Sequence, residues 1–183
     1  MLLDMDRLLK IINNADMTLQ IISAGKSHPN DEPGKRLIQD LYRMIKNADT
    51  GGRLVFIEDY DMTVARALVQ GVDVWMNTPR RPYEASGTSG MKAALNGALN
   101  FSVLDGWWPE AFNGKTGWAI GTEQDYTDLE AQDEADAESL YSTLENSLVP
   151  MYYDQDDHGV PHDWIEAMKE SIATCAPAFS TRR

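Results

Sequence analysis

The segment from Arg80 to Lys92 holds the residues best suited to chemistry. Six small residues, Ala85 to Gly90, lie between a predicted strand and a predicted helix. Small residues let backbone N–H groups approach a ligand closely. The free N–H groups of a helix's first turn, together with the positive end of its dipole, attract anions. The sequence therefore predicts a phosphate-binding turn at this place.

Lys92 adds a nucleophile to this turn. We expect it in the first turn of the helix, where the dipole disfavours a cation and so favours the neutral amine that imine formation requires. A phosphate site beside such a lysine describes a pocket for pyridoxal 5′-phosphate. A glycine-rich helix cap followed by a surface lysine explains the same residues without any ligand, and composition alone leaves both interpretations open.

Two other groups of residues could carry chemistry. His158 and His162 lie four residues apart among acidic residues, but Gly159 and Pro161 separate them. We therefore predict a polar turn before a helix and no metal site. Trp107 and its neighbour Trp108 follow a predicted strand, and they could either form the wall of a sugar or cofactor pocket or cover the edge of the sheet.

The hydrophobic pattern predicts short elements that position these residues. Helices are expected over 1–15, 34–47, 62–69, about 89–96 and 162–173, and strands over 18–24, 53–58, 72–76, 99–104 and 117–120. Buried-type strands that alternate with helices are typical of an α/β fold with a doubly wound parallel sheet. Such sheets bind ligands at the carboxyl ends of their strands, which directs attention to the loops 25–33, 59–62, 77–90 and 105–116.

The composition changes after Gly121. Residues 123–138 contain eight carboxylates and no Lys or Arg, which indicates a solvated helix face or cap. The spacing of Leu140, Leu144 and Leu148 predicts a helix with one apolar face. We therefore divide the chain into a core over 1–121 and a helical extension over 122–183, and we expect the final residues 177–183 to be loosely held.

Charge and cysteine content exclude several classes of protein. The 183 residues include 16 Lys and Arg against 29 Asp and Glu, a net charge of −13. This balance argues against a nucleic acid or an anionic membrane as a partner. Cys175 is the only cysteine, which rules out an internal disulfide and fits a reducing compartment. The acidic N-terminus does not resemble a signal peptide, and a cytoplasmic location is expected.

The segment EASGTSGMKAALNGA, residues 84–98, resembles the pyridoxal-phosphate signature of glycogen and α-glucan phosphorylases. The segments 23–35, 56–62 and 103–121 resemble flanking parts of the same family in order, and the last resembles bacterial and archaeal members. The resemblance implies the second, Rossmann-like half of a glycosyltransferase-B architecture. It implies a Schiff base between Lys92 and the cofactor. It further implies that the cofactor phosphate is bound by Thr88, Ser89 and Gly90, that the cofactor ring is contacted by Tyr60, and that the donor glucosyl unit is bound by Glu84, Ala85, Ser86 and Gly87.

The activity that this resemblance implies is transfer of a glucosyl unit from an α-1,4-glucan to inorganic phosphate, which yields glucose 1-phosphate. Retaining nucleotide-sugar transferases often carry Glu, seven residues, Glu; here Lys92 takes the place of the second acid after Glu84. That replacement favours a phosphorylase over a nucleotide-sugar-dependent glycosyltransferase. A non-catalytic interaction domain is the other alternative.

This sequence departs from the family's pattern at two places. Asp61 stands where some members have a basic residue, and the family's basic segment for substrate phosphate has no counterpart in this chain. We therefore expect a piece of a larger phosphorylase whose N-terminal domain is missing. Such a piece is expected to fold but not to turn over substrate alone.

Overall fold

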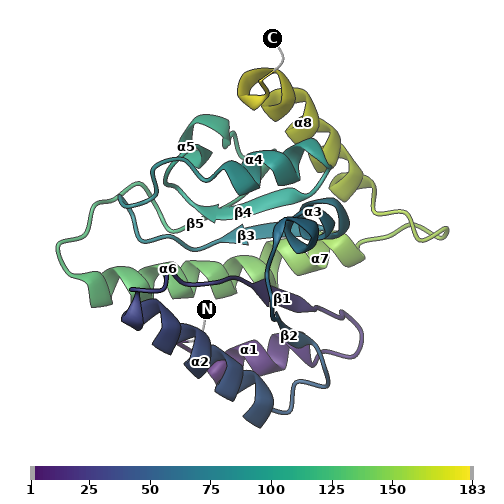
Figure 1. The fold of residues 1–183 in the computed structure, drawn as a ribbon. Coiled ribbons are helices and arrows are strands. Elements are labelled where there is room, and N and C mark those ends of the chain that lie inside the picture. Colours follow the sequence, from purple (N-terminus) through teal and green to yellow (C-terminus); the bar gives the residue numbers. More distant parts are fainter. Residues whose placement is uncertain (1–2, 182–183) are drawn as a thin grey trace. The chain divides into compact units, whose positions relative to one another are not determined.

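The computed structural model describes residues 3–181, which form two compact units, residues 3–65 and 66–181. The first unit contains α1 (Met5–Ile12), β1 (Ile21–Ala24), α2 (Glu32–Asn47) and β2 (Leu54–Ile57), and α3 (Met62–Gly71) leads from it into the second (Figure 1). β1 and β2 pair in parallel, with Ile21 opposite Leu54.

Two hydrogen bonds, one local and one between distant residues, satisfy helix ends in the first unit. Asp31 caps α2, because its carboxylate accepts a hydrogen bond from the N–H of Gly34 at 2.9 Å. The guanidinium of Arg53 donates to the carbonyl oxygen of Ile12 at 2.6 Å and so satisfies the end of α1. Ile12 itself is fully buried.

The second unit is built on a three-stranded parallel sheet in the order β3 (Val74–Asn77), β4 (Leu99–Val103), β5 (Gly117–Ile120). Its helices are α4 (Thr88–Leu95), α5 (Trp108–Ala111), α6 (Leu129–Thr143), α7 (Val149–Tyr153) and α8 (His162–Phe179). Every residue of the central strand β4 is buried, as expected for a strand with a partner on each side.

Helices cover both faces of this sheet (Figure 1). α4 contacts β3, β4 and α8, and α8 also contacts β4, so α4 and α8 form one layer. α6 contacts β5 and lies on the opposite side of the sheet in Figure 1. Between α6 and α7 the chain makes one π-helical turn, Leu144–Leu148. This wider turn precedes Pro150, whose ring cannot join a regular helical ladder.

The structure confirms an α/β fold with parallel sheets. Most predicted elements are present and differ by a few residues at their ends, while the strand predicted over 117–120 is β5. The division at residue 121 stays a prediction. The short helix α5 was not predicted, since four residues give too little periodicity.

The expectation of a loosely held tail was wrong as far as residue 179. α8 continues through Pro177 to Phe179, and the Phe179 ring packs edge-on against Trp107 with centroids 5.0 Å apart. Apolar contact with a residue from another part of the chain outweighs the local helix-breaking signal of Pro177. Residues 182–183 of the same prediction lie outside the described residues.

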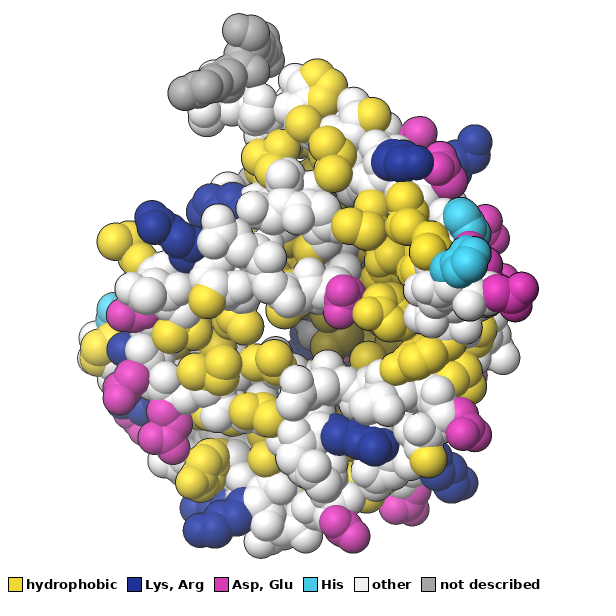
Figure 2. All heavy atoms as spheres, turned by 90° about the vertical axis from the view of Figure 1, so that its right-hand side faces the viewer, with side chains coloured by type: hydrophobic (Ala, Val, Ile, Leu, Met, Phe, Trp, Pro, Cys, Tyr) yellow, Lys and Arg dark blue, Asp and Glu magenta, His cyan; other side chains and the backbone are white. Residues whose placement is uncertain are grey.

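Charged side chains are scattered over the face of the molecule that Figure 2 shows. The face in Figure 2 shows acidic and basic side chains spread singly among hydrophobic ones. Among residues 3–181, no helix is both long enough and apolar enough to cross a bilayer.

Candidate functional site

Two loops that leave the carboxyl ends of β3 and β4 lie side by side. The loop after β3 includes Glu84 and Ser86, and the loop after β4 includes Asp105 and Trp107. The N–H of Glu84 donates to the Asp105 carboxylate at 2.8 Å, and the N–H of Trp107 donates to the carbonyl oxygen of Ser86 at 2.8 Å. Neighbouring parallel strands end at the same edge of a sheet, which brings the two loops together.

A hollow lies between these loops. Its lining residues are Asn77, Pro79, Glu84, Ser86, Gly87, Ser102, Asp105 and Trp107. They come from the ends of β3 and β4, the loops that follow these strands and the residue before α4. This is the edge at which an α/β sheet binds ligands, and polar groups converge on it.

Gly87 begins α4 in a conformation that leaves backbone donors available. It is the N-cap residue, has a left-handed φ of 84°, and provides no side-chain cap. A side chain with a Cβ would strain this backbone. The N–H groups of Thr88 and Ser89 therefore start the helix without the side-chain acceptor that usually occupies this place. The N–H of Gly90 already donates to the carbonyl oxygen of Gly87 at 3.1 Å.

Gly90 is held closely against two neighbours. A Cβ at this position would lie 2.7 Å from Asn100 Oδ1 and 2.9 Å from Trp107 Nε1. The Asn100 side chain donates to the carbonyl oxygen of Gly90 at 3.1 Å and is fully buried. The first turn of α4 is therefore fixed to β4 and to the loop after it.

Sequence reasoning missed Asn100 and Asp105. Asn100 is a polar residue in the middle of an otherwise apolar predicted strand, and that exception is a usable signal because a buried polar group needs a partner. Asp105 directly follows the same strand, but its partner Glu84 could not be identified without the sheet order.

Lys92 is not where the dipole argument requires it. α4 begins at Thr88 and ends at Leu95, so Lys92 lies in the last turn of an eight-residue helix. The prediction of a first-turn lysine was therefore wrong: the left-handed Gly87 starts the helix one residue earlier than expected, and the helix is short. The negative end of the dipole favours a cation there. The Lys92 side chain is exposed, and its role as the cofactor lysine stays a prediction from resemblance.

The other predicted site residues occupy several environments. Ala85 and Thr88 are exposed, while Ser89 is half-buried. Tyr60 belongs to the unit of residues 3–65, where it is half-buried and follows Asp59, a non-glycine residue with a φ of 53°. Its contact with the cofactor ring stays a prediction.

The two interpretations of the tryptophan pair apply to different residues. Trp108 is fully buried and belongs to a core cluster with Leu104, Ala111 and Cys175, where burial raises the pKa of the Cys175 thiol. Trp107 belongs to the same cluster but also lines the hollow. It therefore connects the site to the core of the second unit.

The histidine pair forms the predicted polar turn. The Asp156 carboxylate accepts hydrogen bonds from the backbone N–H groups of His158 at 2.8 Å and Val160 at 3.0 Å, and it contacts His162 Nε2 at 2.8 Å. The Val160 bond, followed by the His162 bond, lowers the Asp156 pKa. In the part of the chain that the structure describes, no three His, Cys, Asp or Glu side chains are grouped so that they could hold a metal ion.

Comparisons with known proteins match this chain to one family. The family model described as carbohydrate phosphorylase matches residues 4–117. A glycogen phosphorylase of Aquifex aeolicus is 51% identical over 98% of this chain, and a maltodextrin phosphorylase of Thermococcus litoralis is 50% identical over the whole of this chain. A glycogen phosphorylase of Mycobacterium tuberculosis is 44% identical. The chain spans 21–26% of the length of these relatives.

Proposed function

Because the chain belongs to the carbohydrate phosphorylase family, we propose that residues 66–181 carry the pyridoxal 5′-phosphate site of an α-glucan phosphorylase. The observation that carries this proposal is the start of α4, which is lined by glycines and uncapped, beside the hollow at the end of β4. In this proposal the chain is part of the Rossmann-like second half of a glycosyltransferase-B architecture.

The residues at the start of α4 fit a phosphate group. The N–H groups of Thr88 and Ser89 have no side-chain cap, and they lie where a helix attracts an anion. Gly87 keeps the approach to these donors free of a side chain. The N–H of Gly90 is shared with the carbonyl oxygen of Gly87, so it is a weaker donor than the other two.

Lys92 would hold the cofactor through an imine. Its side chain is exposed and follows Gly90 by two residues. When bound, pyridoxal phosphate supplies a phosphate that acts as a proton donor toward inorganic phosphate. The N–H groups of Thr88 and Ser89 would orient that phosphate and stabilise its charge.

Residues beside the hollow would contact the donor glucosyl unit. Glu84, Ser86 and Gly87 lie there, and carboxylate and backbone groups are suited to sugar hydroxyls. Ala85 is exposed and would contribute its backbone only. The parent enzyme would transfer glucosyl units from an α-1,4-glucan to inorganic phosphate, with the rest of the protein completing the site.

Absorbance spectroscopy tests the cofactor site directly. After equimolar pyridoxal 5′-phosphate is added and unbound cofactor is removed by gel filtration, the 183-residue chain should retain an imine band at roughly 330–420 nm. Lys92→Ala should abolish this band, while Lys115→Ala, which removes an exposed lysine of the same unit, should leave it unchanged. Identical spectra for the wild type and Lys92→Ala would refute the proposal.

A further inference from the structure

Arg81 connects three segments around the hollow. Its Nη1 donates to the carbonyl oxygen of Leu104 at 2.7 Å and its Nε donates to Asp125 at 3.1 Å. Its own carbonyl oxygen accepts a hydrogen bond from Gln132 Nε2 at 3.3 Å. The Arg81 side chain is only 21% exposed, so its bond to Leu104 is partly shielded from water and stronger for it, whereas the Asp125 side chain is 79% exposed and contributes little.

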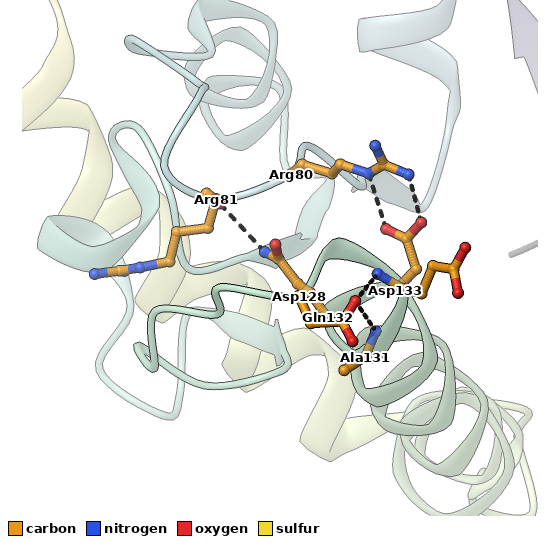
Figure 3. A network of polar contacts seen from close by, with 7 residues as sticks. Arg80, Arg81, Asp128, Ala131, Gln132 and Asp133 are labelled. Atoms are coloured by element: carbon orange, nitrogen blue, oxygen red, sulfur yellow. Dashed lines mark hydrogen bonds and ion pairs between the residues drawn. The ribbon is translucent and has the colours of Figure 1, made fainter.

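The preceding residue fastens the same loop to α6. Arg80 contacts both carboxylate oxygens of Asp133, at 2.9 and 2.5 Å, the two-pronged geometry that suits a guanidinium. This hydrogen-bonded pair, and the charge of Asp133, raise the Arg80 pKa. Figure 3 shows the side chains of Arg80 and Arg81 pointing in opposite directions, with Gln132 of α6 reaching the backbone between them.

The Arg81 contact is the first of a series of hydrogen bonds between the loop after β3 and the segment after β4. Arg81 bonds to Leu104, Glu84 to Asp105, and Ser86 to Trp107. The two segments therefore run together, one residue pair after another, until the loop reaches Gly87 and α4. Leu104 and Asp105 are adjacent in sequence, so the Arg81 contact fixes the backbone that carries the Asp105 carboxylate, which accepts the hydrogen bond from the N–H of Glu84.

We propose that Arg81 is a positioning residue that holds the loop of residues 82–87 in place, and thereby orients Glu84 and the uncapped start of α4. The part of the inference that concerns ligands rests on the proposed function. Arg81 is not among the residues that line the hollow, and it acts through the backbone of Leu104 and through α6. The planar fork of its guanidinium reaches two acceptors at once, which a lysine at this position would not reproduce.

Amide hydrogen exchange in Arg81→Met tests this role without any ligand. The backbone N–H groups of Glu84 and Trp107 should exchange about tenfold faster or more, because a lost hydrogen bond to a charged group is large enough for that factor. The N–H of Phe101 in β4 should be unaffected. Arg66→Met, at an exposed arginine of α3, serves as the control variant and should change none of the three.

A second measurement connects positioning to ligand binding. In Arg81→Met the dissociation constant for pyridoxal 5′-phosphate, read from the imine band, should rise about tenfold, and Arg81→Lys should restore only part of the affinity. Unchanged exchange at Glu84 and Trp107, or an equal increase at Phe101, would overturn the positioning role. If the wild type forms no imine, the proposed function fails, while the exchange rates still decide the role of Arg81.

Discussion

The ring of Phe179 packs edge-on against the ring of Trp107, with an interplanar angle of 80°. Trp107 also lines the hollow beside α4. The last turn of α8 therefore supports the wall of the candidate site from behind, through one aromatic contact. This contact gives the C-terminal helix a role in the site even though it contributes no lining residue.

Phe179→Ala should destabilise the second unit by about 1–3 kcal/mol, because it removes a partly buried ring and its edge-to-face contact. Thermal unfolding followed by near-UV circular dichroism, which reports the tryptophan environment, measures the effect. Ala178→Ser changes an exposed neighbour and should leave the melting temperature nearly unchanged. Equal melting temperatures for wild type and Phe179→Ala would mean that the tail does not support Trp107.

Gly90→Ala should destabilise the unit by about 1–3 kcal/mol, because the added methyl group would collide with Asn100 Oδ1 and Trp107 Nε1. Gly71→Ala is the matched control, since a Cβ at Gly71 would have no neighbour within 4 Å. Chemical denaturation of both variants measures the difference. A Gly90→Ala chain as stable as Gly71→Ala would show that the start of α4 is not closely packed.

Asp136→Asn should stabilise the protein at pH 7. Burial, followed by the charge of Asp133, raises the Asp136 pKa, so the folded state favours the protonated carboxyl. Stability is therefore lost as the pH rises from the unfolded pKa of about 3.9 through the raised folded value. The gain in unfolding free energy of Asp136→Asn over the wild type should disappear below pH 3. Glu134→Gln, at an exposed residue of the same helix, is the control variant for removal of one carboxylate charge.

Asp156→Ala should have the opposite pH dependence. The lowered Asp156 pKa means that the ionised carboxylate is stabilised by folding. This contribution is present above the unfolded pKa of about 3.9 and is lost as the pH falls through the lower folded value. The difference in unfolding free energy between wild type and variant should narrow in acid. A constant difference from pH 7 to pH 2 would contradict the charge-based account, and Asp157→Ala is the exposed control.

Elements with a clear run of buried residues were predicted well from the sequence. The apolar run at 99–104 became β4 because a central strand is covered on both faces and reads as a continuous hydrophobic segment. The turn of small residues before α4 was located because such residues between a strand and a helix are a clear sequence signal, while its binding of phosphate stays a prediction. Glu84, Ser86 and Gly87 all line the hollow that the structure contains.

The features that were missed depend on contacts between distant residues or on a single helix boundary. Nothing near Phe179 in sequence indicates Trp107 as its partner, and nothing near Arg81 indicates Gln132. Lys92 was assigned to the wrong turn because a shift of one residue matters in a helix as short as α4. The resemblance to phosphorylases nevertheless identified the family, since it rests on residue identity and not on helix boundaries.

The most direct test of the central claim is the site of covalent attachment. The chain is incubated with equimolar pyridoxal 5′-phosphate, reduced with borohydride, digested and mapped by mass spectrometry. The account predicts one reduced adduct per chain on the peptide that contains Lys92, at a level well above that on exposed Lys115 and Lys169. A label spread evenly over the lysines, or an unmodified Lys92, would contradict it.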